Sequence, residues 1–394
     1  MGIVSSIGDD LGEVRAALLS GRSGVRAAPA FLDAGLISGV AGVPRLDPAG
    51  VGDRKLRRYL PDAALYAWVA TEEALRQARL KNLKDPRVGL IAGSGAGSLA
   101  TAQEVYTLAQ LRGAAKVSPY VVPRIMGSNV SAALATNLGI RGAVYGLSSA
   151  CATGAHCLGH AMELIQMGKQ DVVIAGGAEE VHVSLAMLFD AMGVLATHYN
   201  QRPEAACRPF DAAREGFALA GGAAMLVLEA EDHARQRGAE VLAVLAGYGA
   251  TCDGADMVFP NREGALRAMR LAWPGDVAAI DYVNAHATGT PRGDLSEAQA
   301  IADFFGPHRP LVSSTKGQAG HAIGAVAAQE LVYTLLMLRE GFVAASSNLE
   351  NVDPALPALN FATVTAPARI DRALSLSLGF GGTNAALVVE RYAD

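Results

Sequence analysis

The stretch GAVYGLSSACATGAHCLGHAMELIQMG at residues 142–168 has a counterpart in RPLVSSTKGQAGHAIGAVAAQELVYTLLMLREG at residues 309–341. Each stretch begins with a short apolar strand that ends at a pair of serines. Each then continues as a helical segment that opens with alanine and glycine, at residues 150–168 and 320–341. A duplicated strand–helix unit predicts two similar halves whose inner helices meet across a pseudo-twofold axis.

Apolar strands alternate with longer helical patterns along the rest of the chain. The predicted strands are Val88–Ala92, Ala143–Leu147, Asp171–Ala175, Ala223–Glu229, Ala279–Asn284, Leu311–Ser314, Leu374–Leu378 and Ala385–Val389. This alternation favours the α/β class. We expect an N-terminal half at residues 1–240 and a C-terminal half at residues 241–394.

The composition excludes several classes of protein. Hydrophobic residues make up 51% of the 394 and charged residues only 18%, which is unlike a disordered chain. A net charge of −5 argues against a general nucleic-acid binder. The best candidate for a membrane span, Ala322–Leu338, contains Gln329 and Glu330, so we expect a buried helix without membrane insertion. No secretory signal pattern is present at the start.

The four cysteines, Cys151, Cys157, Cys207 and Cys252, show no C-x-x-C spacing. This pattern predicts neither a disulfide framework nor a metal site, and reduced thiols in a cytoplasmic protein are the expectation. One of the thiols could still be a nucleophile.

The motif SSACATGAH, residues 148–156, places Cys151 where a strand turns into a helix. Unpaired backbone N–H groups and the positive end of the helix dipole both favour a thiolate at such a position. The alternative is that Cys151 is a small core residue. His156 and His160 lie one helical turn apart but have no third ligand near them in the sequence, so we expect core or interface roles.

The motif NAHATGTPRGD, residues 284–294, places His286 on a polar loop after a strand, where α/β proteins often carry working groups. Thr288, Thr290 and Asp294 are hydrogen-bonding groups able to fix the tautomer of His286. A structural role for a lone loop histidine is the alternative.

The motif SSTKGQAGHAIGA, residues 313–325, has Lys316 and His321 on either side of a glycine turn. We expect His321 to open the long helix, where the helix dipole opposes its protonation. A neutral imidazole can donate a hydrogen bond to a developing oxyanion. Glu330 could pair with Lys316.

The motif LGFGGTNAAL, residues 378–387, contains glycines that permit tight turns and close approach of backbone N–H groups to a substrate. Neither this turn nor GSGAGS at residues 93–98 completes a nucleotide-binding pattern. We therefore predict no nucleotide site.

Together these four motifs, in this order, resemble those of the β-ketoacyl-acyl carrier protein synthases of the thiolase fold. The resemblance runs from GIVSSIG at residues 2–8 through YGATCDGADM at residues 248–257 to the last strand, and is greatest to the type I elongating synthases. It implies two pseudo-symmetric halves in a layered α-β-α-β-α architecture. The N-terminal half would carry the nucleophile and the C-terminal half the two histidines.

The resemblance implies the chemistry. Cys151 would take an acyl group from carrier-protein pantetheine as a thioester. His286 and His321 would stabilise the enolate left when the malonyl group loses carbon dioxide. The backbone N–H groups of Cys151 and Phe380 would form the oxyanion hole. No metal or redox cofactor is called for.

The resemblance also implies supporting roles. Lys316, with Glu330 as its partner, would tune the electrostatics around the histidines. Residues expected to contact the substrate are Thr288 and Thr290 on the pantetheine arm, and Phe189, Ala96 and Leu378 around the acyl channel. A homodimer is expected, because related synthases join through a continuous sheet.

A basic run suggests the macromolecular partner. DRKLRRYL, residues 53–60, gathers Arg54, Lys55, Arg57 and Arg58 in an otherwise acidic protein. Such a run is often only a solvated face, but acyl carrier proteins are acidic and would be steered by it. Arg112 and Lys116 match a second basic stretch used in this way by relatives.

Three positions depart from the family pattern. The family begins with a strand ahead of GIVSSIG, and Met1 stands where that strand should end. Either the start is misassigned or truncated, or one sheet has lost a strand. In both cases MGIVSS is expected to be a strand-to-helix turn. Leu378 stands where type I enzymes usually carry phenylalanine, and Ala96 replaces a glycine. Both changes could alter acyl-length preference.

Four other readings share parts of this pattern. A polyketide ketosynthase would have the same chemistry with a different carrier and chain. A non-catalytic chain-length factor would lack the nucleophile, so Cys151 speaks against it. A thiolase would need a second catalytic cysteine near the C-terminal glycine turn, and no cysteine follows Cys252. Starter-unit synthases carry asparagine at the position of His321.

Overall fold

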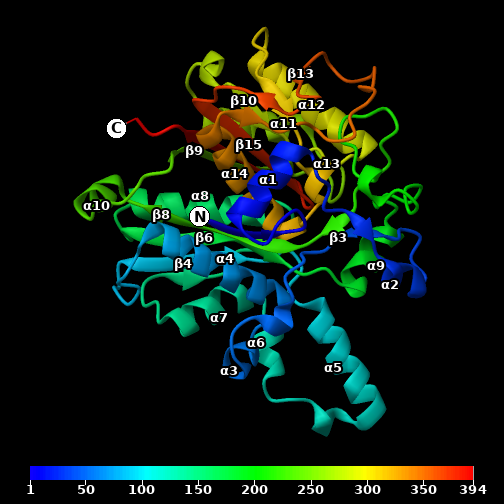
Figure 1. Cartoon of the computed structure of the whole chain (residues 1–394), viewed down its shortest axis with the longest axis vertical. Helices are drawn as coiled ribbons and strands as arrows, with labels where there is room; N and C mark the ends of the chain where they lie inside the picture. The colour runs from blue at the N-terminus through cyan, green and yellow to red at the C-terminus, as the bar shows by residue number, and fades with distance from the viewer. Residues whose placement is uncertain (394) are drawn as a thin grey trace.

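The computed structural model describes residues 1–393 and shows two main sheets with helices between and around them (Figure 1). The strands are β1 (Gly2–Ser5), β2 (Arg26–Ala27), β3 (Val40–Gly42), β4 (Val88–Gly93), β5 (Val144–Tyr145), β6 (Val172–Glu179), β7 (Leu219–Ala220), β8 (Gly222–Glu229), β9 (Val244–Cys252), β10 (Tyr282–Asn284), β11 (Leu311–Ser313), β12 (Phe342–Val343), β13 (Asn360–Phe361), β14 (Ala366–Pro367), β15 (Arg372–Gly379) and β16 (Thr383–Glu390).

The α-helices are α1 (Leu11–Ser20), α2 (Pro29–Asp33), α3 (Arg54–Arg57), α4 (Asp62–Ala78), α5 (Leu99–Arg112), α6 (Val121–Ile125), α7 (Asn129–Leu138), α8 (Thr153–Gln166), α9 (Val183–Ala191), α10 (Glu231–Gln236), α11 (Arg262–Ala272), α12 (Pro291–Phe305), α13 (Lys316–Ala319) and α14 (Ile323–Glu340). Short 3₁₀ helices are η1 (Pro48–Gly50), η2 (Ala114–Lys116), η3 (Pro203–Ala205) and η4 (Val277–Ala279).

The two main sheets have the same topology. The first has the order β5-β4-β6-β8-β1, and the second has β11-β10-β15-β16-β9, with β13 added beside β11. When the five strands of each half are numbered along the chain, both orders read 3-2-4-5-1. The pattern of parallel and antiparallel pairs also matches. The predicted two-half, pseudo-symmetric fold is therefore confirmed.

Helices α8 and α14 form the inner layer between the two sheets, with α4 and α7 outside the first sheet and α11 and α12 outside the second (Figure 1). Small residues allow the inner helices to approach closely. A Cβ on Gly154 of α8 would lie 2.7 Å from the backbone nitrogen of Ala328 in α14. The inner helices thus meet as the repeated motif predicts, and the five layers are those of the expected architecture.

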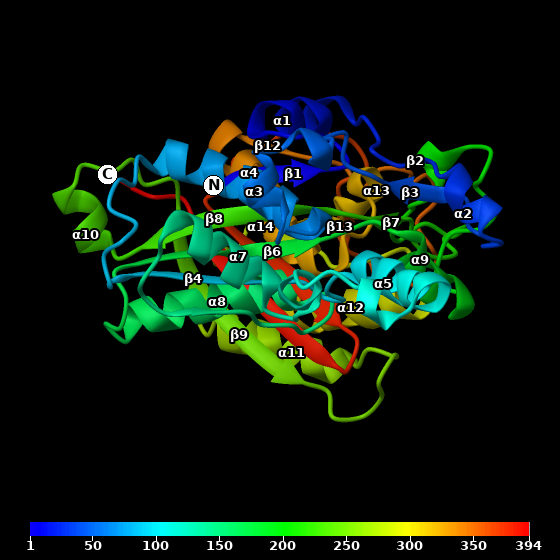
Figure 2. The same ribbon diagram turned by 90° about the horizontal axis from the view of Figure 1, so that it is seen from below.

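Seen from below, α2 and α9 lie at one end of the molecule and α10 at the other (Figure 2). The first end also holds a small sheet of order β2-β3-β7, which packs beside the N-terminal ends of α8 and α14. No helix within residues 1–393 has both the length and the apolar character needed to cross a membrane. The segment Ala322–Leu338 falls almost wholly within α14, which is buried along nearly its whole length.

All eight predicted strands exist, although β5 is only two residues long. The expectation for the N-terminus is wrong. Residues Gly2–Ser5 of the supposed turn form β1, which pairs with β8 in the position that β9 holds in the other half. The first sheet therefore does not lack a strand. Gly2 allows this packing, because a Cβ there would lie 2.1 Å from the carbonyl oxygen of Ala70 in α4.

Candidate active site

The Cys151 thiol lies in a short, strained connection between β5 and α8. Ala150 has a φ of +50°, in the left-handed region that non-glycine residues rarely adopt. The Thr153 hydroxyl donates to the Ala150 carbonyl and accepts from the Ser149 N–H, which holds the turn in place. The helix begins at Thr153, two residues after the cysteine, which confirms the predicted helix start near Cys151.

One sulfur faces two imidazoles, as the motifs predicted. The Cys151 Sγ lies 3.1 Å from the His321 Nε2. The rings of His286 and His321 meet edge to face, with centroids 5.4 Å apart. All three side chains are buried, and one ligand atom from each lies within 4.8 Å of the others. The residues come from three distant stretches of chain.

Burial dominates the titration of the thiol. It raises the pKa of Cys151 to about 12, against the opposing pull of Lys316 and of backbone hydrogen bonds from Phe380 and Cys151 itself. The predicted dipole effect therefore does not produce a thiolate in the free protein. The physical reason is desolvation, which sequence position alone did not reveal.

Burial also lowers the pKa of both histidines well below the usual 6.5, and the positive charge of Lys316 adds to this effect. His321 is therefore neutral, as predicted, but for a different reason. Helix α14 begins at Ile323, so His321 precedes the helix, and desolvation keeps its ring uncharged. The edge of the Phe217 ring covers it, with centroids 4.9 Å apart.

Lys316 and Glu330 form the predicted pair. The Lys316 Nζ donates to the Glu330 Oε1 over 2.6 Å, and each side chain is only 1% exposed. Burial raises the pKa of Glu330 to about 7, although the adjacent ammonium lowers it.

The loop that carries His286 is held by its backbone. The Glu297 carboxylate accepts the N–H groups of His286 at 2.6 Å and Ala287 at 2.7 Å. Burial raises the pKa of Glu297 to about 8, and these hydrogen bonds oppose that rise. Glu297 was not predicted, although it lies three residues after Asp294 and so on the same face of α12.

The expected fixing of the His286 tautomer is wrong. The Thr288 and Thr290 hydroxyls contact each other at 3.1 Å, and the Asp294 carboxylate accepts the N–H groups of Gly289 and Phe210. None of the three side chains bonds to the His286 ring, whose Nδ1 has no partner within residues 1–393. These groups shape the loop and the cavity wall.

The glycine turn after β15 packs against the turn that carries Cys151. A Cβ on Gly379 would lie 2.7 Å from the Ser149 carbonyl oxygen, which also accepts a hydrogen bond from Thr383. This close approach brings the backbone of Phe380 to the Cys151 sulfur. The backbone N–H groups of Phe380 and Cys151 therefore both approach the Cys151 sulfur.

A cavity of about 380 Å³ reaches the three central residues. The predicted site residues that line it are Cys151, Phe189, His286, Thr288, Thr290, His321, Leu378 and Phe380. Ala96 does not line this cavity and packs against the apolar cluster that contains Cys151. Lys316, Glu330 and Asp294 lie behind the wall.

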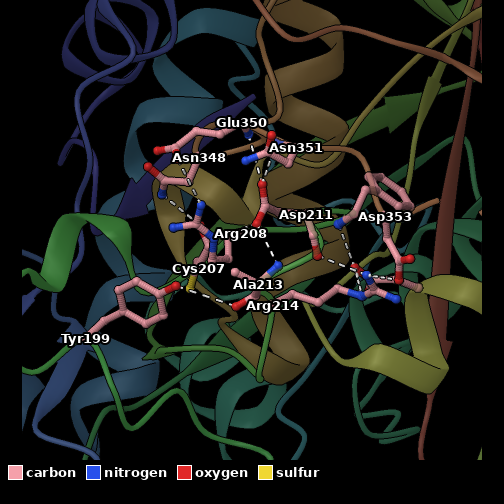
Figure 3. Close-up of polar contacts among 12 residues, drawn as sticks. Tyr199, Cys207, Arg208, Asp211, Ala213, Arg214, Asn348, Glu350, Asn351 and Asp353 are labelled. Carbon is pink, nitrogen blue, oxygen red and sulfur yellow. Dashed lines mark hydrogen bonds and ion pairs between the residues drawn. The ribbon is translucent and has the colours of Figure 1, made fainter. Parts of the chain in front are cut away.

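A buried ionic network that was not predicted supports the His286 loop (Figure 3). Arg214 donates to Asp353 at 2.7 Å and to the Pro291 carbonyl at 3.0 Å. Its Nε also lies 3.6 Å from the Asp294 carboxylate. Because the Asp294 carboxylate binds the loop backbone, Arg214 joins three chain segments behind His286.

Asp211 anchors the same network (Figure 3). Its carboxylate accepts from the Arg208 Nε at 3.0 Å and from the backbone N–H groups of Glu350 and Asn351. These partners are far apart in the sequence, so no local motif indicated the network.

The remaining predicted residues lie outside the cavity. His156 contacts the Ser149 hydroxyl at 2.6 Å and His160 contacts Glu163 at 3.1 Å, so these two histidines do not form a ligand pair. The five exposed cations expected to dock a carrier are Arg54, Lys55, Arg58, Arg112 and Lys116. They belong to the region of α3, α5 and η2, beside the first sheet (Figure 1).

Comparisons with known proteins agree with this geometry. Residues 1–234 match the model of the β-ketoacyl synthase N-terminal domain, and residues 242–350 match that of the C-terminal domain. The chain is 48% identical to 3-oxoacyl-[acyl-carrier-protein] synthase 1 of Escherichia coli K12, over 100% of this chain and 98% of the relative.

Two solved structures are similar over the whole chain. A β-ketoacyl synthase from Burkholderia phymatum STM815 has a TM-score of 0.94 and 34% identity, covering 100% of this chain and 98% of that one. The ishigamide ketosynthase/chain length factor has a TM-score of 0.91 and 29% identity, with the same coverage. With its Cys–His–His centre and matched halves, this chain belongs to the β-ketoacyl synthase family.

Proposed function

We propose that this protein is an acyltransferase that extends acyl chains in fatty-acid synthesis. It condenses an acyl group held on Cys151 with malonyl-acyl carrier protein, giving β-ketoacyl-acyl carrier protein and carbon dioxide. The observation that carries the proposal is the 3.1 Å contact between the Cys151 sulfur and the His321 Nε2, with His286 beside it in one cavity.

In the first step the Cys151 sulfur attacks the acyl thioester of the carrier pantetheine. The new sulfur–carbon bond forms as the pantetheine sulfur leaves, and the thiol proton ends on that leaving sulfur. His321 is the neutral base in contact with Cys151, so it carries this proton. A neutral thiol suits this step, because the proton moves only as the bond forms.

In the second step the malonyl carboxylate leaves as carbon dioxide, and its bonding electron pair moves onto the thioester as an enolate. Neutral His286 and His321 donate N–H groups to the enolate oxygen. Their low pKa is favourable here, because the N–H proton of an uncharged ring is far less acidic than that of an imidazolium and so stays on the ring while it is donated to the enolate oxygen.

In the third step the enolate carbon attacks the acyl carbon on Cys151. The carbonyl oxygen becomes an oxyanion that accepts hydrogen bonds from the backbone N–H groups of Cys151 and Phe380. Collapse of the oxyanion expels the Cys151 sulfur, which takes up a proton from solvent, so each condensation consumes one proton. Lys316 and Glu330 set the electrostatic field around the two histidines.

The cavity walls divide between the two ends of the substrate. Thr288 and Thr290 supply hydroxyls for the amide groups of the pantetheine arm. Phe189 and Leu378 border the acyl chain, and their size limits its length. No step calls for a metal or redox cofactor.

An acidic acyl carrier protein is the proposed partner, and the exposed cations at Arg54, Lys55, Arg58, Arg112 and Lys116 form its docking surface. The Escherichia coli relative is named for acyl carrier protein, and this similarity supports the same carrier for the present protein. Opposite charge on the two surfaces accelerates encounter.

We also propose a homodimer in the cytoplasm. Strand β5 is at the edge of the first sheet, and an antiparallel β5 from a second copy would continue that sheet. The four cysteines are free thiols, which suits a reducing compartment.

The two halves divide the proposed chemistry between them. The N-terminal half, residues 1–240, carries the nucleophile, and the C-terminal half, residues 241–394, carries the two histidines.

A polyketide ketosynthase is the second candidate, because the ishigamide protein shares the fold over the whole chain. The higher identity to the fatty-acid relative favours elongation of fatty acids. The deciding experiment offers purified protein a panel of saturated acyl-carrier and polyketide-carrier thioesters with malonyl-carrier protein. Fatty-acid elongation predicts products two carbons longer than each saturated acyl group. Turnover of polyketide chains alone would overturn the assignment.

A further inference from the structure

Arg292 lies at the mouth of the cavity and has no role in the proposed chemistry. Its side chain is exposed, yet it lines the cavity that contains Cys151. The guanidinium carbon lies 4.5 Å from the centroid of the Phe259 ring, which forms part of the same mouth. This contact with the ring uses none of the guanidinium N–H groups in a conventional hydrogen bond, so they stay available to a ligand.

Burial decreases steadily along the loop that leads from His286 to Arg292. His286 is 7% exposed and Thr288 is 9% exposed, whereas Thr290 is half-buried and Arg292 is fully on the surface. All four residues line one cavity. The loop therefore runs from the floor of the cavity to its mouth, and a bound chain that reaches Cys151 passes both threonines before it reaches Arg292.

The described residues form no ion pair with the Arg292 guanidinium. Within residues 1–393 no carboxylate lies within 4.0 Å of its guanidinium, although most cations near this site are paired. Arg292 is also in the first turn of α12, where a positive side chain opposes the helix dipole. A side chain that opposes the helix dipole at the opening of a site is expected to be there because it binds a ligand.

We propose that Arg292 binds the phosphate that joins the pantetheine arm to the carrier protein. This inference rests on the proposed function, which brings a pantetheine thioester to Cys151. The phosphate is at the opposite end of the arm from the sulfur, so it reaches the mouth when the sulfur is at the floor. A guanidinium can bind two phosphate oxygens at once through charge-assisted hydrogen bonds.

A purely structural role for Arg292 is the alternative that the test must separate. Through its contact with Phe259, the arginine joins the loop before α11 to the first turn of α12. If this were its only role, removal would affect every substrate alike. A phosphate ligand instead makes the effect of removal depend on whether the substrate carries a phosphate.

The experiment compares malonyl-4′-phosphopantetheine with malonyl-pantetheine, which differ only in the terminal phosphate. The condensation kcat/KM of each is measured with acylated enzyme, and the ratio of the two values is reported. We expect the wild-type protein to favour the phosphorylated thioester, and R292A to lower that ratio about tenfold. R292K is expected to keep part of the preference. The control is R270A, an exposed arginine of α11 outside the cavity, which should leave the ratio unchanged.

The outcomes separate the two proposals. If the wild-type protein condenses neither thioester and also fails with the carrier-bound substrates, the proposed function is wrong. If it condenses both but the ratio is one, or is the same in R292A, the phosphate inference is overturned. Added salt gives a second readout, because it should reduce the preference of the wild-type protein and leave R292A nearly unaffected.

Discussion

The Lys316 ammonium and the Glu330 carboxylate are 2.6 Å apart, and both side chains are almost completely buried behind the two histidines. Removing one member of a buried pair leaves an uncompensated charge, which typically costs about 3–5 kcal/mol. We expect K316A to lower the free energy of unfolding by this amount, measured by urea denaturation. The double variant K316M/E330Q should lose less than the two single changes together. Additive losses would show that the pair is not coupled.

The pH dependence of decarboxylation follows from the neutral histidines. Because the pKa values of His286 and His321 are far below 6.5, both rings stay uncharged as the pH falls through 6.5. Release of carbon dioxide from a malonyl thioester should therefore show no titration that belongs to either histidine between about pH 7.5 and 6. Glu297 and Glu330 do titrate near this range, with pKa values of about 8 and 7, so the profile is also measured in E297Q and E330Q. Loss of half the activity near pH 6.5 that persists in both variants would contradict this account.

Lys316 contributes to those low pKa values, after burial. K316A should accordingly move the acidic limb of the decarboxylation profile to higher pH, because one source of repulsion of the imidazolium is gone. The profile is measured at several ionic strengths, since a buried charge is screened little by salt. An unchanged limb in a folded K316A protein would exclude this electrostatic role.

Arg214 should affect the histidine-dependent step more than the acylation step. Its bonds to Asp353 and to the Pro291 carbonyl hold the loop that carries His286, and not the Cys151 turn. We expect R214A to reduce decarboxylation at least tenfold while acylation of Cys151 falls less than threefold. R214K should recover part of the loss. The control R235A removes an exposed pair with Glu231 and should change neither step. Equal losses in both steps for R214A would indicate general destabilisation.

Zinc should inhibit the enzyme and chelation should not. One thiol and two imidazoles with ligand atoms within 4.8 Å of one another match the donor types that zinc prefers. Added Zn²⁺ is therefore expected to block acylation of Cys151 reversibly, with protection by prior acylation. Treatment with EDTA should leave the condensation rate unchanged. A loss of activity on chelation, restored by a metal, would overturn the metal-free mechanism.

The sequence predicted which three residues come together, because each of them follows the end of a strand. Cys151, His286 and His321 each follow a readable apolar strand, and the repeated helix motif brings the two halves together. Lys316 and Glu330 could be paired because both belong to the second copy of that motif. These relationships depend on short segments, which local patterns describe well.

Features set by long-range packing were missed or misjudged. Strand β9 contains Gly247 and Gly249, whose Cβ atoms would lie 1.9 Å and 2.1 Å from carbonyl oxygens of α11. Glycine weakens the strand pattern where a neighbouring helix requires it. Strand β1 is only four residues long, and its pairing with β8 is equally invisible locally.

The electrostatics were harder to predict than the positions. The sequence placed Cys151 close to a helix start but could not show that its thiol is buried, so the direction of its pKa was misjudged. Asp211 has a near partner in Arg208. Its other partners, the backbone of Glu350 and Asn351, and the partners of Arg214 at Pro291 and Asp353 come from segments more than 75 residues away, so no spacing rule could identify them.

The most direct test of the account is to locate the acyl group after a single turnover. The protein is mixed with an acyl-carrier thioester without malonyl substrate, digested, and sequenced by tandem mass spectrometry. We predict one acyl thioester, on Cys151 and not on the neighbouring Cys157, with acylation retained in C157A and abolished in C151A. Acylation of another residue, or an undiminished condensation rate in C151A, would contradict it.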